Sequence, residues 1–404
     1  MRPPGRGMAK RAPAGYHART ARERPPLRDY LPFGKPDFGD REIEAVARVL
    51  RSGWVGMGPE TMAFERELAQ AIGSPHAVTV SSCTAGLHLA LRVAGVGPGD
   101  EVVCPSLTWC SSANVALYLG ARPVFCDVDP ETLSVSPATV AAALTPRTKA
   151  VVAVHFAGLP IDVAALRAAL PAGVAIVEDA AHAFGGRYPD GRLVGTSGNA
   201  CCFSFYANKV LSTGEGGAVA LADGRAADEI RSLRLHALPN DAWKRFTHPK
   251  SVLNANLTQL GYKANYTDLQ AAIGRVQLTR QAEFAARRAA VAAIYRDALD
   301  GLPLAFQRDC THPRHTRHMF VVVLDEGART GRDDLLLALR ARNLGATIHY
   351  EPLHAMPLYN EGREPPRLPH TERIARGILT LPIGACVSDG DAREVAAAVR
   401  EALG

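Results

Sequence analysis

The sequence predicts an α/β protein with a large domain on a mostly parallel sheet and a smaller C-terminal α+β domain. From residue 77 to residue 223, short runs rich in valine and alanine alternate with helical segments. Such alternation is typical of parallel strands that are buried on both faces and joined by helices. The chain has 404 residues and is 47% hydrophobic, which is enough to form two cores.

The large domain is expected to cover residues 31–280. Two helices should precede residue 73, the first beginning near Asp40, with a glycine-containing loop between them. Strands are then expected within segments 77–95, 100–120, 121–129, 149–158, 174–182, 200–206 and 217–223. Residues 224–275 read as two helices around a long irregular segment, and such segments in compact domains are usually functional.

The small domain is expected to cover residues 281–404. An Ala/Arg-rich helix at about 276–300 leads into it, and a helix at 389–403 ends it. Between them the sequence predicts strands at 318–325 and 346–354 and a helix at 332–343.

Positive charge is concentrated at the N-terminus. The formal net charge is +6, and residues 1–30 hold eight Lys/Arg residues against two acidic ones, so residues 31–404 are formally neutral. Residues 1–30 are rich in proline, glycine and arginine without apolar periodicity, which predicts a flexible basic tail. Because residues 31–404 carry no formal net charge, nucleic acid is not expected as a partner.

The sequence predicts a cytoplasmic enzyme without a metal site. No apolar run approaches the roughly 20 residues of a membrane span, and the N-terminus lacks the apolar core of a secretory signal. The eight cysteines are scattered and form no CxxC pair, which disfavours zinc and favours reduced, buried thiols.

The first strand–turn–helix, at 77–95, predicts an anion site. Small residues, including Thr84 and Ala85, occupy the start of the helix. The free backbone amides and the helix dipole favour a phosphate there, with the Thr84 hydroxyl assisting. Small residues also serve as ordinary helix caps, so the pattern alone leaves that alternative open.

A lysine and an aspartate at strand ends point to pyridoxal 5'-phosphate. Lys209 follows an apolar strand and precedes the glycine-rich turn 214–217, and Asp179 ends the strand before it. Pyridoxal phosphate chemistry needs a lysine that forms a Schiff base and an acid that keeps the pyridine nitrogen protonated. The motifs GxxxxGK[ST] and GxGxxG after a strand are absent, which disfavours nucleotide hydrolysis and dinucleotide binding.

Three further side chains could serve the same cofactor. Trp109 follows a strand end and could stack on a flat ring. His182 could approach the phenolic oxygen of the ring, and Ser204 could reach the phosphate. A core tryptophan and a hydrogen-bonded core histidine are the structural alternatives.

Ordered motifs over residues 31–385 resemble the DegT/StrS family of PLP-dependent nucleotide-sugar aminotransferases. The matching stretches are SGWVGMGPE, SSCTAGLHLAL, GDEVVCPSLTW, PVFCDVDPETL, VHFAG, VEDAAHAFGG, FSFYANK–TGEGGAV, RLHALPNDAWKR, GYKANYTDLQAAIG and IHYEPLH. The resemblance implies a fold type I architecture, like that of aspartate aminotransferase. It also implies a homodimer with shared active sites at the subunit interface.

The resemblance assigns roles to individual residues. It implies that Lys209 carries the cofactor and moves the proton, that Asp179 binds the pyridine nitrogen, and that Trp109 lies against the ring. His182 matches the position near O3′. Thr84, Ala85 and Ser204 match phosphate ligands, and Asn265 matches an asparagine that reaches the phosphate of the partner subunit. The segment 237–265 would then be an intersubunit element.

The resemblance also implies the activity. Some relatives carry histidine at the lysine position and catalyse dehydration or deoxygenation, so Lys209 favours transamination. The SGWVGMGP and LHALPNDAWKR stretches favour transfer from L-glutamate (or glutamine) to an NDP-4-keto-6-deoxyhexose, in amino-sugar biosynthesis for an antibiotic or a surface polysaccharide. The alternatives are a 3-keto sugar, a keto-cyclitol, or a non-catalytic PLP-binding regulator or complex subunit.

Two more residues are candidates for substrate contact. Tyr206 lies between Ser204 and Lys209, and His349 is expected on a small-domain strand beside Tyr350. Strand and interface packing is the alternative for His349 and Tyr350.

Overall fold

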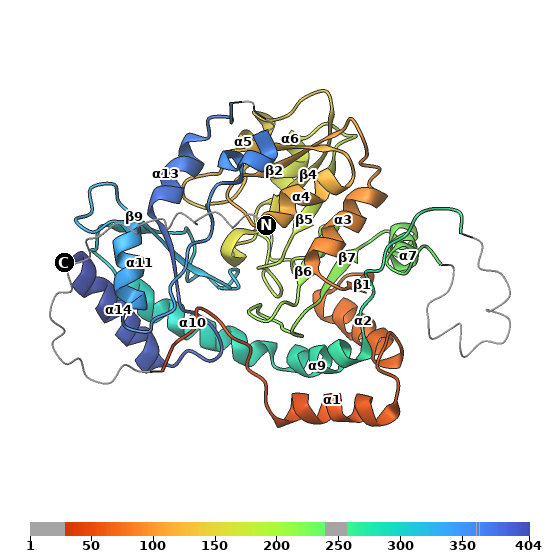
Figure 1. Ribbon diagram of the computed structural model, residues 1–404, viewed down its shortest axis with the longest axis horizontal. Helices are drawn as coiled ribbons and strands as arrows, with labels where there is room; N and C mark the ends of the chain where they lie inside the picture. Colours follow the sequence, from red (N-terminus) through yellow and green to blue (C-terminus); the bar gives the residue numbers. More distant parts are fainter. Residues whose placement is uncertain (1–28, 239–256, 361, 363) are drawn as a thin grey trace, which may run out of the picture.

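The computed structural model describes residues 29–238, 257–360, 362 and 364–404 (Figure 1). The expected basic tail, apart from its last two residues, lies outside the described residues. So does most of the segment 237–265 that was expected to form an intersubunit element.

A seven-stranded sheet forms the centre of the larger part. The strand order is β1-β7-β6-β5-β4-β2-β3, and all neighbours from β6 to β3 pair in parallel. Only β7 is antiparallel to both of its neighbours, so the sheet is mostly parallel, as the sequence predicts. The strands are β1 (His76–Val80), β2 (Glu101–Pro105), β3 (Arg122–Cys126), β4 (Thr148–Val154), β5 (Ala175–Asp179), β6 (Ala200–Ser204) and β7 (Gly217–Leu221).

Helices cover both faces of this sheet, and successive residues of β4 pack into different cores. Val151 and Ala153 belong to one core cluster, whereas Ala150 and Val152 belong to the other. Strands buried on both faces explain why the sequence shows continuous apolar runs rather than polar alternation. The helices of this part are α1 (Asp40–Ser52), α2 (Pro59–Ile72), α3 (Cys83–Val93), α4 (Ser111–Tyr118), α5 (Pro137–Ala141), α6 (Val163–Ala169), α7 (Gly224–Leu233) and α9 (Asp268–Thr279).

A three-stranded antiparallel sheet organises the C-terminal part, which runs from teal to blue in Figure 1. Its order is β10-β9-β8, and its apolar face packs in a separate core with the long helices. Its elements are α10 (Gln281–Ala298), β8 (Leu304–Phe306), β9 (Phe320–Leu324), α11 (Arg332–Arg340), α12 (Pro357–Asn360), α13 (Pro369–Gly377), β10 (Ile378–Leu381) and α14 (Asp389–Leu403).

The prediction of a strand at 346–354 is wrong. Only Thr347 forms a bridge, to Thr380, and the backbone then leaves the small sheet. Its amides bind elsewhere, since Leu353 N–H donates to the Ser106 carbonyl of the large part at 3.0 Å. Pro352, which has no N–H, could not have continued a ladder.

The expected boundaries between the tail and the large domain, at residue 30, and between the two domains, at residue 280, stay predictions. Helices α9 and α10 meet at Arg280, which caps both of them. The first described residues pack against the C-terminal part, because Leu31 pairs with Leu344 and belongs to its core. Within the described ranges, no helix is long and apolar enough to cross a membrane.

Candidate active site

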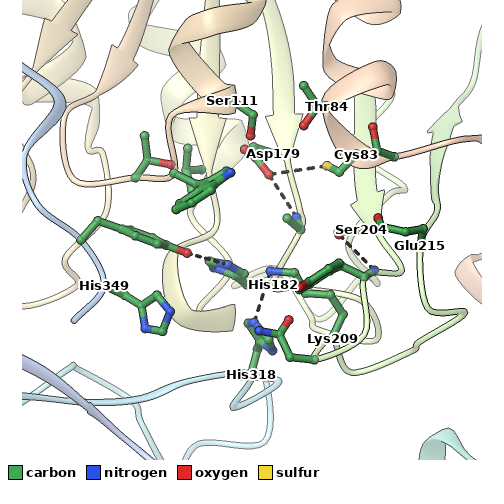
Figure 2. A pocket seen from close by; sticks show the side chains of 18 of the residues that line it. Cys83, Thr84, Ser111, Asp179, His182, Ser204, Lys209, Glu215, His318 and His349 are labelled. Atoms are coloured by element: carbon green, nitrogen blue, oxygen red, sulfur yellow. Dashed lines mark hydrogen bonds between the residues drawn. The ribbon is translucent and has the colours of Figure 1, made fainter. Parts of the chain in front are cut away.

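Most of the predicted site residues meet in one cavity of about 600 Å³ at the carboxyl ends of β5 and β6 (Figure 2). Parallel strands deliver their C-terminal side chains to the same edge of a sheet, which is where ligands bind in such folds. The predicted residues that line the cavity are Thr84, Trp109, Asp179, His182, Ser204, Tyr206, Lys209 and His349. Ala85 and Asn265 do not line it.

Asp179 is the last residue of β5 and is 5% exposed. Its Oδ2 accepts a hydrogen bond from the Ser112 hydroxyl at 2.8 Å, and its Oδ1 accepts one from the Ala181 amide at 3.2 Å. The Cys83 thiol lies 3.9 Å from Oδ1. This buried carboxylate is held in place by its neighbours and faces the cavity, as an acid that pairs with a pyridinium must.

Lys209 lies in the turn that joins β6 to β7. Its amide donates to the Tyr206 carbonyl at 2.9 Å, which directs the side chain into the cavity. Burial lowers the pKa of Lys209 from 10.5 to about 8, against the opposing charges of Cys83 and Asp179. A larger fraction of the amine is therefore neutral near neutral pH, and the neutral form is the nucleophile and the base.

His182 faces the same space from the segment after β5. Burial, with the charge of Lys209, lowers its pKa well below the ordinary value, so the ring is neutral. Its Nε2 lies 3.3 Å from the Tyr350 hydroxyl, while its buried Nδ1 has no hydrogen-bond partner. Trp109 is 60% exposed, and its ring lies 5.9 Å from that of Tyr350.

The part of the cavity that is expected to bind the cofactor phosphate lies at the start of α3. Thr84 and Ser204 both line the cavity there, and Ser204 is 8% exposed. Gly217 lets α3 pack directly on β7, because a Cβ at this position would lie 2.6 Å from the Cys83 amide nitrogen. The Ala85 amide already donates to the Ser82 hydroxyl at 3.1 Å. Ala85 can bind a phosphate only if this capping bond opens.

His349 lines the opposite side of the cavity, and its Nδ1 pairs with the Thr380 hydroxyl at 2.9 Å. Burial and the charge of Lys209 lower its pKa to about 3. Asn265 instead donates to the Tyr266 carbonyl at 2.9 Å. Its expected role toward a partner subunit stays a prediction.

The sequence reasoning missed several polar residues of the site, two of which contact Asp179 or Lys209. Ser112 on α4 binds Asp179, and His318, just before β9, lies beside Lys209. His318 is 109 positions away from Lys209 in the chain. Its sequence context, HMFVVVLD, reads as the start of a buried strand, so no local signal marks it.

Comparison with known proteins identifies the family. The sequence matches the DegT/DnrJ/EryC1/StrS aminotransferase family over residues 36–400. The chain belongs to this family. It is therefore a PLP-dependent aminotransferase of the sugar aminotransferase family, as the resemblance implies.

Solved structures of the family are similar along nearly the whole chain. The aminotransferase TlmJ from Streptoalloteichus hindustanus is 37% identical, with a TM-score of 0.84 over 92% of this chain and 98% of its own. DesI, solved in the presence of its TDP-sugar product, is 34% identical, with a TM-score of 0.82 over 93% of each chain. The putative sugar aminotransferase Spr1654 from Streptococcus pneumoniae, in its PLP form, is 28% identical, with a TM-score of 0.83 over 93% of this chain and all of its own.

The cavity fits the cofactor of the family. It offers a buried carboxylate at Asp179, a half-exposed indole at Trp109 and hydroxyls at Thr84 and Ser204. The unpartnered Nδ1 of His182 is a buried polar atom that the protein alone leaves unsatisfied. Such atoms are rare in folded proteins unless a ligand or a water molecule completes them.

Proposed function

We propose that this aminotransferase moves an amino group from L-glutamate, or glutamine, to an NDP-4-keto-6-deoxyhexose. The observation that carries the proposal is the Lys209 amine, whose pKa desolvation lowers to about 8, in one cavity with Asp179. DesI, which is similar over 93% of both chains, was solved with a TDP-sugar product. That similarity supports a nucleotide-linked sugar as the acceptor.

The protein's own residues have distinct tasks in this proposal. When bound, pyridoxal 5'-phosphate supplies a carbonyl that condenses with amines and a ring that accepts electron density. Lys209 would hold the cofactor covalently and, once released, its neutral amine would serve as the base that moves the proton. Asp179 would keep the ring nitrogen protonated, Trp109 would stack on the ring, and His182 would contact the ring oxygen.

The remaining predicted residues bind phosphate and sugar. Thr84, Ala85 and Ser204 bind the cofactor phosphate, and Asn265 of the partner subunit in a homodimer completes that site. Tyr206, which is 47% exposed at the rim, and His349 contact the sugar. The position of His349 across the cavity from Thr84 leaves the space between them for the substrates.

The test is a reaction in two halves with purified protein. Glutamate should bleach the yellow colour of the cofactor-loaded enzyme, and a nucleotide-linked 4-keto-6-deoxyhexose should restore it. The same mixture should yield an amino sugar whose carbon position and stereochemistry follow from mass spectrometry and proton NMR. The matched variant Lys209→Ala should transfer no amino group at a measurable rate.

The panel of acceptors decides between the alternatives. Turnover with a 3-keto sugar or a keto-cyclitol, and none with 4-keto-6-deoxyhexoses, would replace the proposed substrate. If glutamate still bleaches the cofactor but no acceptor receives the amino group, the proposed sugar substrate would also be excluded. Wild-type turnover by Lys209→Ala would overturn the assigned role of the lysine.

A further inference from the structure

The segment before β9 is fixed against the large sheet. Thr316 N–H donates to the Gly158 carbonyl at 3.0 Å, and Met319 N–H donates to the Ala157 carbonyl at 3.2 Å. The Thr316 hydroxyl also donates to the His182 carbonyl at 2.6 Å. These three bonds leave the intervening His318 little freedom, and its side chain lines the cavity.

His318 has one polar side-chain contact in the described part of the chain. Its Nε2 lies 3.3 Å from Lys209 Nζ, and its ring lies 4.6 Å from that of His182 (Figure 2). The side chain is 3% exposed, and its buried Nδ1 has no hydrogen-bond partner. An unsatisfied buried polar atom destabilises the fold, so a side chain that served packing alone would be better apolar.

The imidazole of His318 is neutral. Burial lowers its pKa well below the ordinary value, and the nearby Lys209, His182, Arg288 and His349 lower it further. A neutral imidazole has one nitrogen that donates and one that accepts. When the proton is on Nδ1, Nε2 can accept an N–H from the lysine. A protonated ring would instead donate to the lysine lone pair and block it.

We propose that His318 is a positioning residue for Lys209, whose free amine donates one N–H to Nε2 of His318. A neutral amine has two N–H bonds and one lone pair, so this contact leaves the lone pair free to take a proton. The inference rests on the proposed function, because it concerns the lysine while it is detached from the cofactor and serves as the base. It adds a residue to the contribution of the C-terminal part, which already supplies His349 and Tyr350 to the cavity.

The first test titrates Lys209 in the cofactor-free protein. An amine-selective acylating reagent is applied at several pH values, and modification of the Lys209 peptide is measured by mass spectrometry. His318 accepts a hydrogen bond from the ammonium form as well, so its loss in His318→Leu should lower the pKa of Lys209 by about one unit. His318→Gln retains an acceptor at the position of Nε2 and should titrate like the wild type.

Two further variants separate positioning from damage to the fold. His318→Asn is polar but too short to reach Lys209, so it should titrate like His318→Leu. His354→Leu removes a histidine of similar burial that binds the Ser106 hydroxyl and does not line the cavity. It should leave the titration of Lys209 unchanged. Wild-type titration in both His318→Leu and His318→Asn would overturn the proposal.

Kinetics supply a second readout in the loaded enzyme. The His318→Leu variant should lose about tenfold in kcat with little change in the KM of the keto sugar, and His318→Gln should recover most of the loss.

Borohydride reduction distinguishes a failure of this inference from a failure of the proposed function, since it fixes the cofactor to the residue that holds it. Cofactor fixed elsewhere than Lys209 refutes the proposed role of Lys209. Cofactor fixed to Lys209, with an unchanged titration in the variants, refutes only the role of His318.

Discussion

The hydroxyl of Ser112 donates a 2.8 Å hydrogen bond to Asp179 Oδ2, across 67 positions of the chain. Ser112 lies in the first turn of α4, and Asp179 ends β5. The Thr108 hydroxyl lies 2.9 Å from that of Ser112, so a short chain of hydroxyls ends on the carboxylate. Because all three side chains are buried, the carboxylate keeps one orientation toward the cavity.

Removal of the Asp179 charge should slow the reaction strongly. Breaking a buried ion pair by neutralising one partner costs about 3–5 kcal/mol, which corresponds to a loss of at least about a hundredfold in kcat for Asp179→Asn. Asp179→Glu keeps the charge and should lose less. Single-turnover kinetics with glutamate measure both variants. Equal rates for Asp179→Asn and the wild type would exclude a pairing of Asp179 with the ring nitrogen.

Lys209 should make the stability of the cofactor-free protein depend on pH. Its pKa is about 8 in the folded protein and about 10.5 in the unfolded chain, so the unfolded chain binds more protons between these values. The free energy of unfolding therefore rises with pH between about 8 and 10.5. The stability gained is lost again as the pH falls toward 8. The full difference is about 3 kcal/mol.

The variant Lys209→Met isolates this contribution. It should be more stable than the wild type at pH 7, and its advantage should shrink as the pH rises from 8 to above 10.5, because the lysine is neutral in both states only above 10.5. Urea unfolding of the two cofactor-free proteins at each pH gives the difference, in which the titration of the other groups largely cancels. An advantage that stays constant with pH would contradict the lowered pKa.

A mixing experiment should reveal whether two subunits share each site. If Asn265 serves the partner's phosphate site, an equimolar mixture of Lys209→Ala and Asn265→Ala subunits contains heterodimers with one intact site. After unfolding and refolding together, the mixture should reach about a quarter of wild-type activity, because half of the dimers are mixed and each has one complete site. Activity no greater than the mean of the separate variants would mean that Asn265 acts within its own subunit.

The sequence predicts those parts of the site whose signals are local. Lys209 and Asp179 follow apolar strands, and the carboxyl ends of parallel strands meet, so their proximity could be inferred without a structure. His318 and Ser112 could not be found in this way, because only long-range packing brings them to Lys209 and Asp179. The strand expected around His349 is wrong for a similar reason: its backbone bonds to the large part, a choice that local β-propensity does not encode.

Gly158 should be essential for holding the segment that contains His318. Its φ is +103°, and a Cβ there would overlap the Thr316 hydroxyl and lie 2.9 Å from the His182 carbonyl oxygen. In Gly158→Ala, left-handed strain of about 1–2 kcal/mol adds to overpacking of about 1–3 kcal/mol. We expect a loss of about 2–5 kcal/mol in the free energy of unfolding, measured by urea denaturation.

The matched control is Gly191→Ala. Gly191 has a φ of +87°, but a Cβ there would meet nothing within 4 Å. This variant should lose only the backbone part, about 1–2 kcal/mol, and should keep its turnover. Gly158→Ala should in addition lose kcat, because a displaced segment 316–319 moves His318 away from Lys209. Equal losses of stability in the two variants would show that the segment adapts to the added methyl group, and that its contacts with Gly158 do not hold His318 in place.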